Sequence, residues 1–154
     1  MKIFAIFIYL VINYGASLED MIAAGKYTWV NESITAKNFP VEGAGIVRFE
    51  SKIFHFNRGI SSDDAVAAIQ ADDPQNPWAP AKIEHLLAYG AMNPEEQRQY
   101  PSVGLGSVAK VEGGCFVSYL YRSDAGRNLD LGWWGNDWHG GYRFLAVRKL
   151  PFAA

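Results

Sequence analysis

Alternating hydrophobic and polar positions near the C-terminus form the clearest pattern in the chain. Leu129, Leu131 and Trp133 occupy every second position of residues 128–134. The residues between and after them are Asn128, Asp130, Gly132 and Trp134. A period of two is typical of a β-strand, in which successive side chains point to opposite faces. The pattern predicts a strand that buries the first set and presents the second set to solvent.

Further strands are predicted on both sides of this one. Residues 46–56 are rich in β-branched and aromatic residues, which favour strands. Residues 103–108 and 115–121 are separated by a glycine-containing turn, which predicts a hairpin. Residues 127–134 and 142–150 follow as two more strands. The C-terminal half is therefore predicted to be an antiparallel sheet.

Two main helices are predicted between the first of these strands and the others. Residues 61–64, Ser-Ser-Asp-Asp, form a helix start, because a hydroxyl caps free amides and acids favour the N-terminal end of the helix dipole. A second helix has an apolar stripe over residues 83–87, with Pro80 in its first turn and Gly90 as its C-cap. A short helical segment is predicted at 93–99. The order of elements indicates an α+β domain with two helices packed on a twisted antiparallel sheet.

Residues 1–20 allow two interpretations. Lys2 precedes an apolar run of about ten residues, and the small residues Gly15 and Ser17 follow, as in a secretory signal peptide. The run is too short for a transmembrane helix, which needs about 20 apolar residues. Alternatively, Met21 is the true start and residues 1–20 are an N-terminal extension. Both interpretations predict a single domain over residues 21–154, exported or at the cell surface in the first case and cytoplasmic in the second.

Composition narrows the class of protein. Charged residues make up 19% of the 154 residues and the net charge is −2, without a Lys/Arg stripe of the kind that binds nucleic acid. Cys115 is the only cysteine, so the chain can form neither an intramolecular disulfide nor a cysteine-based zinc site. We interpret His55 and His85 as packing or surface residues. No cofactor is predicted.

Several segments resemble a family of mostly uncharacterised bacterial proteins. They are residues 54–65, 80–90, 97–108 and 143–149, and the resemblance spans about residues 21–149. Members of that family tend to begin near the equivalent of Met21, which favours the late start. The C-terminal part is similar to the variable proteins of diversity-generating retroelements. This resemblance implies a C-type-lectin-like fold in which the first and last strands pair, here residues 47–56 with 142–150.

The resemblance also implies which residues are scaffold and which are presented. The scaffold residues would be Leu129, Leu131, Trp133, Trp138, Phe144, Ala146 and Val147. The ligand-binding positions, which adenine-directed mutagenesis would diversify, would be Asn128, Asp130, Gly132, Trp134, Gly135, Asn136, Asp137, His139, Gly140, Gly141 and Tyr142. We therefore predict a non-catalytic ligand-binding or display module with a protein or a surface glycan as its partner.

Three other interpretations remain open. Asn136 and Asp137, with Asp130, offer oxygen ligands to Ca²⁺ as in a carbohydrate-binding lectin, although the Glu-Pro-Asn signature and the paired cysteines of true C-type lectins are absent. Asp130, Asp137 and His139 are the candidates for an acid/base or metal site of an enzyme. In the third interpretation Trp133 and Trp138 are core anchors and the polar residues are ordinary loop.

Overall fold

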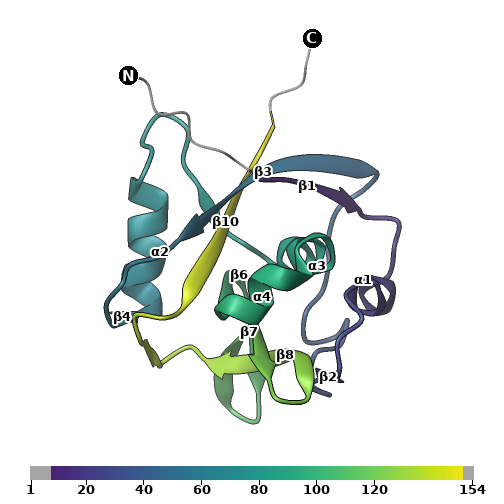
Figure 1. The fold of residues 1–154 in the computed structure, drawn as a ribbon. Coiled ribbons are helices and arrows are strands. Elements are labelled where there is room, and N and C mark those ends of the chain that lie inside the picture. Colours follow the sequence, from purple (N-terminus) through teal and green to yellow (C-terminus); the bar gives the residue numbers. More distant parts are fainter. Residues whose placement is uncertain (1–7, 151–154) are drawn as a thin grey trace.

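A large, mostly antiparallel sheet organises the chain, and the computed structural model describes residues 8–150 of it (Figure 1). Its strands lie in the order β1-β3-β10-β6-β7-β8-β2, and β5 pairs with β10 outside this path. They are β1 (Ile8–Asn13), β2 (Trp29–Val30), β3 (Ile46–Phe54), β5 (Ala79–Pro80), β6 (Ser102–Val111), β7 (Gly114–Ser123), β8 (Gly126–Trp133) and β10 (Arg143–Lys149). The short strands β4 (Ile60–Ser61) and β9 (Asp137–Trp138) form a second sheet.

Four helices accompany the sheets within residues 8–150. They are α1 (Leu18–Ala24), α2 (Ser62–Ala71), α3 (Ile83–Met92) and α4 (Pro94–Gln99). The predicted start of α2 is confirmed, because the Ser61 side chain accepts a hydrogen bond of 3.1 Å from the Asp64 amide. The short helix predicted near residue 93 is confirmed as α4. The α+β class is thus established.

Helix α3 differs from its prediction at both ends. It begins at Ile83, not in the turn after Pro80, because Pro80 lies in β5 opposite Ala146 and the Ala81 amide still donates to the Leu145 carbonyl. Gly90 is an interior residue of the helix. A Cβ atom there would lie 2.4 Å from the Tyr27 hydroxyl, so the glycine permits close packing and does not end the helix.

The predicted pairing of the first long strand with the last one is confirmed. β3 and β10 are antiparallel, with Phe54 opposite Phe144 and Glu50 opposite Arg148. The Arg148 Nε atom lies 2.5 Å from Glu50 Oε2, so the two strands are also joined by an ion pair. On its other side β10 pairs in parallel with β6, which places the last strand near the centre of the sheet.

The N-terminal segment is part of the folded unit. β1 pairs with β3 over six residues, and Leu10 and Ile12 are almost fully buried. This alternating apolar segment supplies both an edge strand and core side chains, whereas the single domain was predicted to begin at residue 21. Residues 1–7 of the signal-like stretch lie outside the described residues. Among the described residues, no helix combines the length and apolar character needed to cross a membrane.

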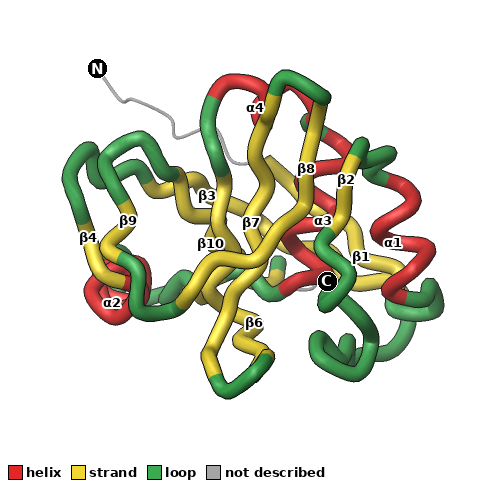
Figure 2. Tube along the Cα trace, turned by 90° about the horizontal axis from the view of Figure 1, so that it is seen from below, coloured by secondary structure: helices red, strands yellow, loops and turns green. Residues whose placement is uncertain are grey.

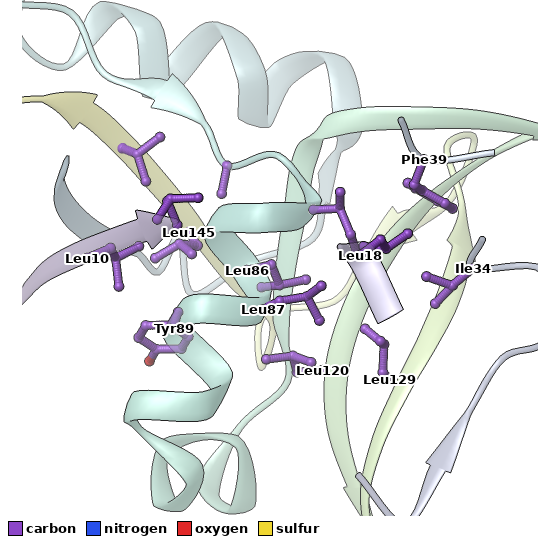
Figure 3. Close-up of a cluster of buried hydrophobic side chains, with 14 of the residues drawn as sticks. Leu10, Leu18, Ile34, Phe39, Leu86, Leu87, Tyr89, Leu120, Leu129 and Leu145 are labelled. Carbon is purple, nitrogen blue, oxygen red and sulfur yellow. The ribbon is translucent and has the colours of Figure 1, made fainter. Parts of the chain in front are cut away.

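Buried side chains form two clusters. The leucine-rich core lies between the sheet and helices α1 and α3, and Figure 3 shows its leucines projecting toward one another. It includes Leu10, Leu18, Leu86, Leu87, Leu120, Leu129 and Leu145. The aromatic core lies on the side of α2. It includes Phe54, Trp78, Trp138 and Phe144, with Tyr119 and Tyr142 packed against it.

Candidate binding surface

The strand predicted from alternation is β8, and its register with β7 defines two faces. Leu129 lies opposite Leu120, and both are fully buried in the leucine-rich core. On the other face Asn128 lies opposite Tyr121, and Asp130 lies opposite Tyr119. The predicted alternation is thus confirmed for Leu129 and for Leu131, which packs against the same core, and the outer side of the strand is shared with the tyrosines of β7.

Three residues of this strand differ from expectation. Asn128 is only 4% exposed, because the Gln97 side chain donates to its carbonyl and its own amide donates to Ser123. Gly132 is buried under Trp138, whose ring would lie 2.5 Å from a Cβ atom at this position. Trp133, expected as a scaffold residue, is 54% exposed because it lies at the end of β8. Asn128 and Gly132 are therefore structural, whereas Trp133 belongs to the surface.

The charged candidates do not converge. Asp130 is half-buried and accepts a hydrogen bond of 2.9 Å from the Asn31 amide. Asp137 is exposed and belongs to β9, where it pairs with β4. His139 is exposed, and its ring packs at 4.7 Å from that of Tyr142. Within residues 8–150 no hydrogen bond joins the two aspartates to the histidine, and no group of three or more His, Cys, Asp or Glu side chains could hold a metal ion.

Trp138 is the anchor of the loop between β8 and β10, as predicted for a scaffold residue. It is 2% exposed, and its Nε1 atom donates a 2.9 Å hydrogen bond to the Ser62 hydroxyl. The same hydroxyl donates to the Trp134 carbonyl at 2.7 Å. His55 Nε2 donates to the Gly140 carbonyl at 2.7 Å. The serine bonds hold the loop against the start of α2, and the histidine bond holds it against the segment after β3. Gly135 and Gly141 are exposed and Asn136 is half-buried.

A cleft of about 380 Å³ opens beside this loop, and we call it the tyrosine cleft. It is lined by four tyrosines, Tyr100, Tyr119, Tyr121 and Tyr142, together with Pro101, two arginines and two glutamines. Figure 2 shows α4, which supplies part of one wall, beside the end of β7. Of the residues predicted from sequence, only Tyr142 lines it. Tyr119 and Tyr121 were missed, although their alternation with Leu120 is the same signal that identified β8.

The tyrosine rings pack on one another. Tyr119 and Tyr121 are stacked with centroids 5.3 Å apart, and the Tyr119 and Tyr142 rings are 6.1 Å apart. Burial raises the pKa of the Tyr119 and Tyr142 hydroxyls, and the nearby Asp130 carboxylate raises the pKa of Tyr119 further. These phenols are therefore protonated at neutral pH and can donate hydrogen bonds.

The wall opposite these rings is fixed by α4 and the segment after it. The Gln97 side chain is 1% exposed and donates to the Tyr121 carbonyl at 2.7 Å, which ties α4 to β7. The Arg143 guanidinium lies 4.3 Å from the centre of the Tyr100 ring, and the Tyr100 hydroxyl donates to Glu96. Such contacts prearrange the cleft, which lowers the entropic cost of binding a ligand there.

Comparison with family models, with curated proteins and with solved structures found no match to this chain.

Proposed function

We propose that the protein is a non-catalytic binding module, and that its ligand occupies the tyrosine cleft and the adjoining loop of residues 134–142. The observation that carries the proposal is the meeting of Tyr119, Tyr121 and Tyr142 around one open cleft. Tyrosine offers a large, rigid contact area at low cost in side-chain entropy, and its hydroxyl supplies a polar contact. The separation of Asp130, Asp137 and His139 gives an acid/base mechanism no comparable support.

We further propose that the scaffold is C-type-lectin-like and related to the variable proteins of diversity-generating retroelements. The pairing of β3 with β10, with α2 and α3 between them in sequence, supports this relationship. Diversified positions would then be restricted to side chains that reach the surface. They would include Trp133, Asn136, Asp137, His139 and Tyr142, and they would exclude Asn128 and Gly132. A near-repeat of the DNA encoding this stretch that differs at adenines, close to a reverse transcriptase gene, would establish the relationship.

The binding proposal is tested with an array of immobilised peptides and oligosaccharides. The unmodified protein is compared with Tyr121→Ser, which removes a ring from the cleft. The matched control is Tyr9→Ser, because Tyr9 is 50% exposed on β1, an edge strand separated from β7 by three other strands. We expect Tyr121→Ser alone to lose binding while its circular dichroism spectrum is unchanged. Equal binding by all three proteins would contradict the proposal.

A further inference from the structure

We infer that the tyrosine cleft binds a proline-rich peptide segment in the polyproline II conformation, flanked by an acidic residue. This inference rests on the proposed function, since it names the ligand class of the same cleft. It follows from three features of the lining: its hydrogen-bonding groups, the spacing of its rings and its charge.

The lining is rich in donors. Tyr119, Tyr121 and Tyr142 each bring a hydroxyl that can donate a hydrogen bond, and the arginines Arg98 and Arg122 can only donate. No carboxylate lines the cleft within the part of the chain that the structure describes. A ligand that fits these groups must offer acceptors.

The acceptors nearest to the cleft are engaged or covered. Asp130 accepts from the Asn31 side chain and from the Leu131 amide. A Glu96 oxygen accepts from Tyr100, and Gln97 Oε1 is buried. The tyrosine hydroxyls can accept as well as donate, but Arg98 and Arg122 add donors that no lining carboxylate balances. A segment with carbonyl groups and few N–H groups suits this excess of donors.

A polyproline II segment has this character. Proline has no backbone N–H, and the carbonyls of the polyproline II helix make no internal hydrogen bonds and face outward. Its proline rings pack against aromatic side chains that line a groove. The 6.1 Å between the Tyr119 and Tyr142 rings matches about two residues of such a helix, which rises about 3.1 Å per residue. Pro101 adds an apolar surface on the opposite wall.

The positive charge of Arg98 and Arg122 favours an acidic residue beside the proline segment. Arg122 is exposed, and Arg98 is held only by an exposed ion pair of 3.5 Å with Glu95. Exposed pairs of this kind are weak, so both guanidinium groups can face a ligand. An aspartate or glutamate beside the proline segment would complement them and would direct the peptide along the cleft.

The test is fluorescence anisotropy with a fluorescein-labelled oligoproline of about ten residues that carries aspartate at one end. We expect saturable binding that weakens at least about tenfold when alanines replace the prolines. Tyr121→Ser should weaken binding to a similar degree, and Tyr121→Phe, which keeps the ring, should weaken it less. Arg122→Gln should reduce binding of the acidic peptide but not of a neutral oligoproline. Tyr9→Ser should bind as the unmodified protein does.

Two outcomes would overturn the inference. One is the absence of saturable binding up to about 1 mM peptide. The other is equal affinity for the proline and alanine peptides. If a neutral oligosaccharide binds instead, and Tyr121→Ser abolishes that binding, the inference fails while the proposed function stands. If Tyr121→Ser changes binding of no peptide or oligosaccharide, both fail.

Discussion

The leucine-rich core and the aromatic core use the two sides of one sheet differently. The leucine-rich core is closed by α1, α3 and β1, and its leucines are buried. The aromatic core continues into half-exposed rings, because Tyr119 and Tyr142 pack on Trp138 and also line the tyrosine cleft. Aliphatic side chains have no polar end, whereas tyrosine can be buried at one end and hydrated at the other. The first core is closed by aliphatic packing, and the second continues into the rings of the proposed binding surface.

The largest effect is expected from removing β1 and the start of α1, which close the leucine-rich core. A chain that starts at Met21 loses the buried side chains of Leu10, Ile12 and Leu18. Each contributes about 1.5–3 kcal/mol of burial, a total comparable to the whole stability of many domains. We expect the shortened chain to lack a cooperative unfolding transition in urea, as followed by circular dichroism. A stable, cooperative shortened chain would show that β1 is dispensable and would favour the late start.

A single cavity in the same core should have the next largest effect. Leu120 belongs to β7 and is fully buried in the leucine-rich core. Leu120→Ala should lower the free energy of unfolding by about 2–5 kcal/mol. Val108→Ala is the matched control, because Val108 is 48% exposed on the neighbouring strand. Urea denaturation measures both. Similar losses in the two variants would contradict the assignment of Leu120 to a tightly packed core.

The leucine-rich core also contains a titratable group at its margin. Burial, with a smaller contribution from Lys82, lowers the pKa of His85 from 6.5 to about 4. Because the folded-state pKa is the lower one, the unfolded chain binds the proton first as the pH falls. The stabilisation of the folded state by neutral His85 is complete above pH 6.5 and is lost as the pH falls toward 4. It amounts to about 3 kcal/mol. In His85→Gln, the pH dependence of unfolding free energy should be flatter in this window. Identical slopes in both proteins would contradict a buried, neutral His85.

Loss of one hydroxyl group, that of Ser62, should destabilise the aromatic core. Ser62→Ala leaves the Trp138 N–H without its acceptor and the Trp134 carbonyl without its donor. Leaving such buried groups unpaired costs about 1–3 kcal/mol. Ser61→Ala serves as a comparison that removes the α2 cap but not the tryptophan contact. Only Ser62→Ala should change the near-ultraviolet circular dichroism of the tryptophans.

The smallest effect is expected at the surface of the loop. Joint replacement of Asn136, Asp137 and His139 by alanine should change the unfolding free energy by no more than about 1.5 kcal/mol, because these side chains are exposed or half-buried and Asp130, which accepts from Asn31, is left in place. Thermal melting measures this. A calcium-dependent rise in melting temperature that the variant lacks would contradict the proposal of a binding module without metal and would favour the calcium lectin.

Local patterns were enough to predict most elements. The strands around Leu120, Leu129 and Phe144, the cap at Ser61 and the pairing of β3 with β10 follow from periodicity, capping and resemblance. The class of fold was accessible because each helix and strand is marked by a signal within a few residues, whereas the pairing of β3 with β10 came from the resemblance. The specific C-type-lectin-like fold remains a proposal.

The errors concern positions whose environment is set by distant residues. Gly90 resembles a helix end, but Tyr27 lies against it, 63 residues earlier in the chain. Asn128 and Gly132 fit the alternating pattern of exposed residues, yet Gln97 and Trp138 cover them. Alternation identifies the face on which a side chain lies, but not whether another element covers that face. For the same reason the tyrosine cleft, which needs α4 beside β7, was only partly predicted.

The central place of β10 has a consequence for biosynthesis. Its neighbours β3 and β6 are made long before it, and the Glu50–Arg148 ion pair joins residues 98 positions apart. While the ribosome is still translating, the slot between these strands is vacant and their edges are open to wrong partners. The sheet can close only after the last described strand has left the exit tunnel. Nascent chains should thus depend on chaperones until β10 has emerged, and folding should be slow because the pairing is so distant in sequence.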